Sequence, residues 1–242
     1  MATKRLRVFA GPNGSGKTTI VNDLREKIHF GVYVNADDIE KNLSENGTLS
    51  FSNYKLDIHQ EKTQKFFRES NFAPVMRNEP DLWTKIFVSH NQLTINSRIN
   101  SYLCADIAEF IRQQLLENGI SFTYETVMSH KNKIDFLEYA LSRGYRVYLY
   151  YIATEAPEIN IDRVSIRVRQ NGHNVNPDKI SGRYYRSLQL LKNAIKVSNR
   201  AYLWDNSGEA ALLFAEITDG IAVETFDKIP AWFINNVLDS EI

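Results

Sequence analysis

The chain opens with a glycine-rich segment whose residue types are suited to holding phosphate. Residues 11–18 read Gly-Pro-Asn-Gly-Ser-Gly-Lys-Thr and match the pattern G-x-x-x-x-G-K-[ST]. In such a loop, backbone N–H groups turn toward the phosphates, the lysine ammonium adds a point charge, and the threonine hydroxyl binds Mg²⁺. The loop follows a strand-like run at 6–10 and precedes a predicted helix at 17–28, whose N-terminal dipole favours anions. We therefore predict a nucleotide site with contacts from Gly11, Asn13, Gly14, Ser15, Gly16, Lys17, Thr18 and Thr19, with Thr18 as the metal ligand.

Two acidic residues that follow predicted strands are candidates for chemistry at the same edge of a sheet. Asp37 comes after the predicted strand 31–35 and is the candidate base for a hydroxyl acceptor. The same residue, with Glu40 three positions later, has the form of a capping box at a helix start. Glu125, beside Thr126, ends a third predicted strand, and both are candidate acceptor contacts. The alternative for Glu125 is a solvated carboxylate at a strand end.

Arginines in the second half of the chain are candidates for binding the transferred phosphoryl group. Arg163 and Arg167 lie four positions apart on one face of a predicted helix, and Arg183 lies beyond a turn at 171–174. Because phosphoryl transfer spreads charge over the equatorial oxygens, such cations stabilise its transition state. We predict that these arginines lie in a lid at about 157–183 that closes on the phosphates. Lys17 binds the same phosphates from the loop. His173, in the turn of that lid, is either a phosphate and substrate contact or only a turn residue.

The phosphate loop by itself does not choose among motors, switches and kinases. Transporter-type ATPases need a signature motif and a hydrophobic strand ending in Asp-Glu, and the sequence contains neither. A small-molecule kinase needs a base, phosphate-binding cations and a lid that excludes water, and each has a candidate here. A noncatalytic nucleotide-binding module remains the alternative.

The elements that must position these residues alternate between strands and helices. This alternation predicts an α/β fold in which a mainly parallel, five-stranded sheet is covered on both faces. We expect a single domain over residues 1–242, with a mostly helical insertion at about 48–100 and a short C-terminal helix from Pro230. The predicted strands are 6–10, 31–35, 120–124, 146–152 and 201–204, and the clearest helices are 102–117, 132–143, 157–170 and 177–197.

The composition argues against several classes of partner and location. Lysine plus arginine equals aspartate plus glutamate, 29 each, so no global basic field favours nucleic acid. No apolar stretch is long enough for a signal peptide or a membrane span, and we expect a cytoplasmic protein. The single cysteine, Cys104, excludes an internal disulfide, and its helical spacing with Ile107 and Ile111 predicts a buried packing residue.

The ordered series of motifs resembles the zeta-toxin family of P-loop kinases. The resemblance is carried by the loop from Phe9 to Thr19, by Val34-Asn35-Ala36-Asp37-Asp38-Ile39 and by Tyr124-Glu125-Thr126. It continues through the run at 157–168, Gly172-His173, Arg183-Tyr184 and Asp205-Asn206-Ser207, as in the small bacterial zeta-like branch. The chain departs from that branch in the lid turn, where Asn171 replaces a glycine, and in the size of the insertion. Both departures concern the acceptor more than ATP.

The resemblance implies a three-layer fold like that of nucleoside monophosphate kinases, and ATP- and Mg²⁺-dependent phosphorylation of a nucleotide sugar such as UDP-N-acetylglucosamine. It also implies that the protein is the toxin of a toxin–antitoxin pair, with an antitoxin protein as partner. Carried onto this chain, it makes Lys17 and Thr18 the ATP and Mg²⁺ contacts, Asp37 the base and Glu125 a substrate contact. Arg163, with Arg167 or Arg183, would serve the transferring phosphoryl group. Acceptors that remain open are a nucleoside, a polynucleotide end and a protein side chain.

Overall fold

The computed structural model describes residues 3–69, 81–170 and 175–238, and its internal contacts divide the chain into two compact units. The core unit comprises residues 1–30 and 123–242, and the inserted unit comprises residues 31–122. The core unit is therefore discontinuous in sequence.

A twisted sheet forms the centre of the core unit. Its strands are β1 (Arg5–Ala10), β6 (Phe122–Thr126), β7 (Arg146–Ala153), β8 (Arg200–Asp205), β9 (Leu212–Thr218) and β10 (Ala222–Thr225). They run in the order β10-β9-β8-β7-β1-β6. The pairs β1–β7 and β7–β8 are parallel, whereas β9 and β10 are added in antiparallel sense at one edge. The predicted α/β class is confirmed, and the described part of the chain contains more strands than the predicted five.

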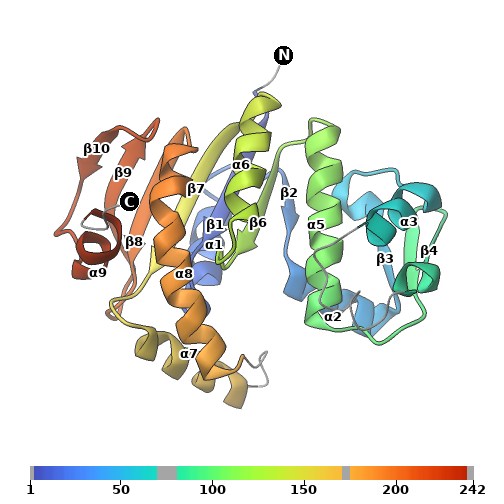
Figure 1. The fold of residues 1–242 in the computed structure, drawn as a ribbon, viewed down its shortest axis with the longest axis horizontal. Helices are drawn as coiled ribbons and strands as arrows, with labels where there is room; N and C mark the ends of the chain where they lie inside the picture. Colours follow the sequence, from blue (N-terminus) through green and yellow to red (C-terminus); the bar gives the residue numbers. More distant parts are fainter. Residues whose placement is uncertain (1–2, 70–80, 171–174, 239–242) are drawn as a thin grey trace. The chain divides into compact units, whose positions relative to one another are not determined.

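Helices cover both faces of this sheet. They are α1 (Lys17–Arg25), α6 (Asn132–Ser142), α7 (Pro157–Arg169), α8 (Pro177–Lys196), α9 (Ala231–Phe233) and a following π turn, η3 (Ile234–Leu238). Figure 1 shows α6 and α8 in front of the sheet and α1 behind it. Successive residues of β7 face opposite sides: the Tyr151 hydroxyl lies 2.9 Å from Ser187 Oγ on α8, whereas Tyr150 stacks on Phe9 with ring centroids 4.5 Å apart.

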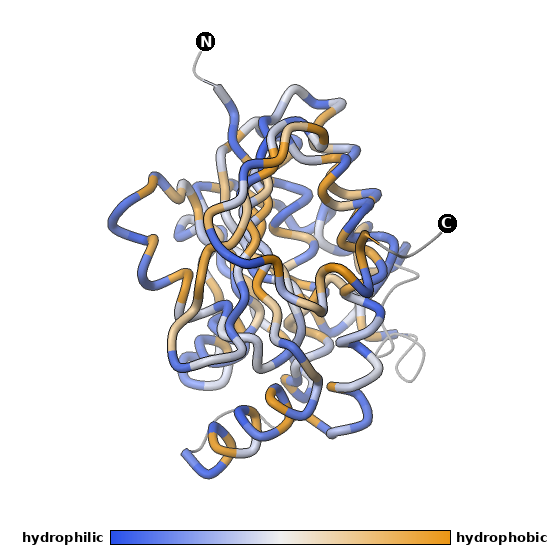
Figure 2. The backbone as a smooth tube through the Cα atoms, turned by 90° about the vertical axis from the view of Figure 1, so that its left-hand side faces the viewer, coloured by the Kyte–Doolittle hydropathy of each residue, from blue (hydrophilic) through white to orange (hydrophobic). Residues whose placement is uncertain are grey.

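Burial of the strands explains why they read as apolar runs. Residues 6 and 8 of β1 and residues 147, 149, 151, 152 and 153 of β7 are fully buried, as expected for parallel strands covered on both faces. In Figure 2 orange segments run along the central strands, while helices alternate between orange and blue, as amphipathic helices do. Among the described residues, every helix is too short or too polar to cross a lipid bilayer.

The inserted unit combines helices with a small sheet. Its elements are β2 (Val32–Val34), α2 (Ala36–Asn46), β3 (Thr48–Ser50), η1 (Phe51–Tyr54), α3 (Gln60–Glu69), η2 (Leu82–Lys85), β4 (Ile86–Ser89), β5 (Gln92–Ile95) and α5 (Ser101–Glu117). The strands β3, β5 and β4 pair antiparallel in that order. The sequence predicts the helices of this region but not its sheet, because strands of three or four residues carry little periodic signal.

Helix α5 forms the centre of the inserted unit and packs against α2. Cys104 on α5 is fully buried, in agreement with the predicted packing role. Burial, and then the negative charges of Glu40, Asp37 and Asp106, raise the pKa of its thiol to about 12. The thiol therefore stays neutral at physiological pH and is a poor nucleophile.

The start of α2 corrects one expectation. The cap residue is Asn35, whose side-chain oxygen accepts a hydrogen bond of 2.8 Å from the backbone N–H of Asp37. The predicted capping box with Asp37 at the cap is therefore wrong. Asn35 fits the cap because a short amide in extended backbone reaches the N–H two residues on. Asp37 lies in the first turn, and its side chain is exposed.

Candidate active site

The phosphate loop joins β1 to α1, as the motif predicts. Gly16 caps α1 in the left-handed region at φ 93°, which leads the chain directly into the helix at Lys17. The Lys17 ammonium donates hydrogen bonds of 2.9 Å to the carbonyl oxygens of Gly11 and Pro12. The lysine therefore folds over its own loop, with its charge held beside the N-terminus of α1.

The loop fits closely against two other segments of the core unit. A Cβ atom at Gly14 would lie 2.5 Å from the carbonyl oxygen of Asn160 on α7. A Cβ atom at Gly16 would lie 2.2 Å from Nδ2 of Asn206, which follows β8. The same Nδ2 donates a hydrogen bond of 2.8 Å to the carbonyl oxygen of Ser15. The glycines thus allow α7 and the loop after β8 to support the phosphate loop from behind.

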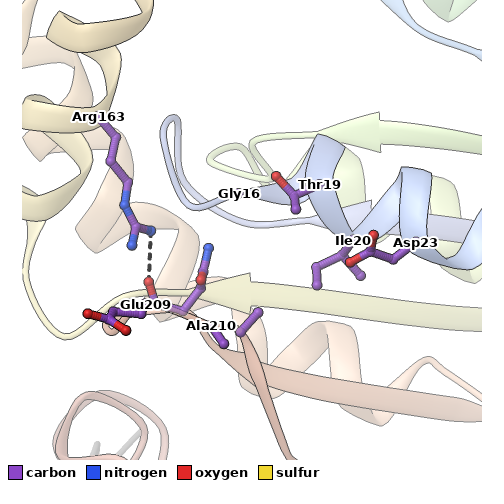
Figure 3. Close-up of a pocket in the computed structure, with 9 residues that line it drawn as sticks. Gly16, Thr19, Ile20, Asp23, Arg163, Glu209 and Ala210 are labelled. Carbon is purple, nitrogen blue, oxygen red and sulfur yellow. Dashed lines mark hydrogen bonds between the residues drawn. The ribbon is translucent and has the colours of Figure 1, made fainter.

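A cavity of about 430 Å³ opens beside the first turns of α1. Thr19 and Asp23 of α1 line one side, and Arg163 of α7 and Glu209 line the other (Figure 3). Its volume is within the range of small-molecule sites. The cavity begins at Gly16, so a ligand whose phosphates occupy the loop has space next to it for further groups.

Arg163 forms a fixed wall of this cavity. Its guanidinium donates hydrogen bonds of 2.7 Å to the carbonyl oxygen of Asn206 and 3.2 Å to that of Gly208. Both bonds are made by N–H groups in the guanidinium plane, so the carbonyl oxygens of the loop after β8 fix the orientation of that plane. A guanidinium held in this way is suited to stacking on a planar ring.

The hydroxyl of Thr18 and the carboxylate of Glu125 lie together. Thr18 Oγ1 donates a hydrogen bond of 3.1 Å to Glu125 Oε2, and β6, which carries Glu125, is the neighbour of β1 in the sheet. Hydroxyl and carboxylate oxygens are the hard donors that Mg²⁺ prefers. In the described ranges no cluster of three or more histidine, cysteine, aspartate or glutamate side chains is arranged to hold a metal.

Thr126 has a structural contact with the loop region. Its carbonyl oxygen accepts a hydrogen bond of 3.3 Å from the Gly11 N–H, and its hydroxyl oxygen accepts one of 3.1 Å from the Met128 N–H. These bonds fix the backbone where β6 leaves the sheet.

Basic residues gather near the phosphate loop around His130, which follows β6. Although His130 is exposed, loss of part of the ring's hydration, and then the positive charges of Arg186, Lys133 and Arg183, lower its pKa. Arg183 also reaches the loop, with Nη1 3.4 Å from Oδ1 of Asn13. We call His130, Lys133, Arg183 and Arg186 the basic cluster.

The remaining predicted residues are placed as follows. Asp37 lies in the inserted unit, in the first turn of α2. Arg167 is exposed on α7, one turn beyond Arg163. His173 lies outside the described residues.

Several residues that build this site are not evident from sequence. Sequence marks Asn206 only within the run Asp205-Asn206-Ser207, without a role, and Asp23, Glu209, His130, Lys133 and Arg186 are not among the predicted site residues. For Asn206 and His130, which follow β8 and β6, the available signal is position, because polar residues after the parallel strands of a sheet reach the same edge.

Comparison with known proteins agrees with the fold. A chain of the AvrRxo1-ORF1:AvrRxo1-ORF2 complex, crystallised with sulphate ions, superposes with a TM-score of 0.57 at 14% identity, covering 93% of this chain and 61% of that one. A structure of the PezAT chromosomal toxin–antitoxin system of Streptococcus pneumoniae superposes with a TM-score of 0.50 at 13% identity, covering 100% and 81%. At these identities the likeness concerns the fold.

Similarity in sequence is more local. An uncharacterized protein of Haemophilus influenzae is 32% identical over 69 residues, which are 28% of this chain and 49% of that protein. The chain thus spans about half the length of this curated relative and 61% of the AvrRxo1 chain. The family model described as Zeta toxin matches residues 92–219, more than half of the 242 residues. The chain therefore belongs to the zeta toxin family.

Proposed function

We propose that this protein is a Mg²⁺- and ATP-dependent kinase that transfers the γ-phosphoryl group of ATP to a hydroxyl of a nucleotide sugar such as UDP-N-acetylglucosamine. The observation that carries the proposal is the joined phosphate loop and cavity. The loop, the Thr18–Glu125 pair and the Arg163 wall offer places for phosphates, a metal and a base ring, and Gly16 belongs both to the loop and to the lining of the cavity.

In this proposal the triphosphate binds over the loop, and Lys17 turns from the carbonyl oxygens of Gly11 and Pro12 to the β- and γ-phosphates. The adenine ring enters the cavity beside Arg163, whose guanidinium plane offers a stacking surface. The Thr18 hydroxyl and the Glu125 carboxylate would hold Mg²⁺ directly or through water. When bound, the ion neutralises charge that develops on the phosphate oxygens.

The transfer step assigns a role to each charged residue. The Asp37 carboxylate accepts the proton of the acceptor hydroxyl while the hydroxyl oxygen forms a bond to the γ-phosphorus. The bond between the γ-phosphorus and the oxygen that bridges it to the β-phosphorus breaks, and ADP leaves. Arg183, already in contact with Asn13 of the loop, and Arg167 bind the transferring oxygens. Arg163 then serves the nucleotide more than the reacting group, since its N–H groups are bound to loop carbonyl oxygens.

The basic cluster supports an anionic acceptor. The positive charges of Arg186, Lys133 and Arg183 all act on His130, and the ATP phosphates have their own donors in the loop backbone. With Arg183 assigned to the transferring group, the other two cations of the cluster, Lys133 and Arg186, are suited to the diphosphate of a nucleotide sugar. An uncharged nucleoside or a protein hydroxyl would bring no negative charge to pair with these cations. By analogy with the PezAT toxin–antitoxin system, we also propose an antitoxin protein as a partner.

The test is a phosphorylation assay with purified protein, ATP and Mg²⁺, in which product masses are measured with UDP-N-acetylglucosamine, N-acetylglucosamine or no acceptor. We expect a mass gain of one phosphoryl group on the nucleotide sugar only. Asp37→Asn should lower kcat by about 100- to 10,000-fold while ATP still binds, whereas the neighbouring exposed Asp38→Asn is the matched control. Full turnover in Asp37→Asn would refute the base assignment, and equal use of the uncharged sugar would refute the role of the basic cluster.

A further inference from the structure

Asp205, the last residue of β8, joins the C-terminal helix to the loop that follows the strand. Its Oδ1 accepts a hydrogen bond of 2.9 Å from the indole Nε1 of Trp232 on α9 and one of 2.6 Å from the hydroxyl of Ser207. Trp232 is 1% exposed and packs edge-to-face on Phe214 of β9, with ring centroids 5.7 Å apart. The indole is therefore packed in the core with its N–H directed at Asp205.

The loop held by Asp205 contacts the nucleotide site at two places. Asn206 donates to the carbonyl oxygen of Ser15 in the phosphate loop at 2.8 Å. Its own carbonyl oxygen, with that of Gly208, holds the guanidinium of Arg163. Ser207 Oγ in turn accepts a hydrogen bond of 2.8 Å from the backbone N–H of Glu155 after β7.

We infer that Trp232 is a positioning residue of the nucleotide site, which acts through Asp205 on Asn206 and Arg163. Trp232 is not among the residues that line the cavity, and it lies outside residues 92–219 that match the family model. Its indole N–H fixes one oxygen of a carboxylate, that oxygen fixes Ser207, and the intervening Asn206 is thereby held against Ser15. The C-terminal helix thus sets the affinity for ATP as well as contributing to the core. This inference rests on the proposal that the cavity and loop bind ATP.

Geometry and chemistry favour this role over simple packing. A phenylalanine at position 232 would keep an aromatic ring against Phe214 but would lack the N–H donor. Asp205 would keep the Ser207 bond and lose a charge-assisted one, which is the stronger kind. The carboxylate would then be free to turn, and with it the backbone of Asn206.

The test compares ATP dissociation constants, measured by titration calorimetry without acceptor, with melting temperatures of the nucleotide-free protein. Trp232→Phe should raise the ATP Kd about five- to tenfold. Phe233→Leu, which alters the neighbouring ring without touching a hydrogen bond, is the matched control and should lower the melting temperature with an unchanged Kd. Ser207→Ala, a half-buried loop residue, tests the same path without disturbing the core and should also raise the Kd. Asp205→Asn keeps the Oδ1 acceptor and should retain most of the affinity.

Equal ATP affinities of the wild-type protein, Trp232→Phe and Ser207→Ala would overturn the inference alone. A wild-type protein that did not bind ATP would overturn both the proposed function and this inference. A Kd that rose as much in Phe233→Leu as in Trp232→Phe would show a general effect of core packing and would also overturn it.

Discussion

Gly16 and Asn206 form a contact whose energy can be isolated by a double-mutant cycle. In Gly16→Ala the new Cβ would lie 2.2 Å from Asn206 Nδ2, so the amide must move and its hydrogen bond to the Ser15 carbonyl oxygen is lost. The alanine must also adopt φ 93°, which costs about 1–2 kcal/mol for a residue with a Cβ. Adding about 1 kcal/mol for the lost hydrogen bond gives a destabilisation of about 2–3 kcal/mol.

The second variant, Asn206→Ala, removes the same hydrogen bond without the backbone strain and should destabilise by about 1 kcal/mol. In the double variant this bond is lost once, although the two single variants count it twice. The destabilisation of the double variant should therefore be about 1 kcal/mol smaller than the sum of the destabilisations of the two single variants. The difference grows if displacing the amide in Gly16→Ala adds strain. We would measure the free energies of unfolding in urea by circular dichroism, together with ATP affinity. Additivity within about 0.3 kcal/mol would refute the contact.

Three further outcomes are expected. Asn35→Ala removes the cap of α2 and should lower the free energy of unfolding by about 1 kcal/mol. It should also lower kcat, because the cap holds the backbone of Asp37, whereas Asn46→Ala at the other end of the helix is the control. An unchanged kcat in Asn35→Ala would contradict the positioning of Asp37 by Asn35. Glu125→Gln should raise the Mg²⁺ concentration for half-maximal activity by about tenfold or more, because a neutral amide replaces the carboxylate that would hold the ion. An unchanged Mg²⁺ dependence would exclude Glu125 from the metal site. His130 has a lowered pKa in the folded protein, so below about pH 6.5 the unfolded chain binds a proton that the folded chain does not. The free energy of unfolding should therefore decrease as the pH is lowered below about 6.5, and it should decrease less in His130→Gln. Urea unfolding at several pH values would measure both.

The long periodic elements could be predicted closely from sequence. The helix expected at 132–143 is found at Asn132–Ser142, and the strand expected at 146–152 is found at Arg146–Ala153. Both lie between turn signals and bury one continuous apolar set, which local pattern captures. The expected short helix after Pro230 is also present.

The strands that sequence missed depend on partners rather than on pattern. All four residues of β10 are exposed, so no alternation of buried and exposed positions marks it. Its position follows from pairing with β9, which sequence reasoning also missed. Likewise the short strands β3, β4 and β5 are defined by one another.

The candidate site divides in the same way. The phosphate loop is contiguous, so its residues and their order could be predicted. The pairs Thr18–Glu125 and Ser15–Asn206 join residues 107 and 191 positions apart, and no local signal specifies which strand-end residue meets which loop residue. Only the order of the strands brings them together.

That order has a consequence for the time at which the site is assembled during synthesis. Strand β1, which leads into the phosphate loop, pairs with β7, and Arg5 lies opposite Arg146. This pairing cannot form until Arg146 has emerged from the ribosome. At about 5–20 residues per second, the intervening stretch of about 140 residues takes on the order of ten seconds to make. Asn206, which supports the loop from behind, arrives later still. A nascent chain therefore carries the phosphate-loop sequence long before the contacts that support the loop can form, and a chain interrupted before β8 would lack both Asn206 and the loop carbonyl oxygens that fix Arg163.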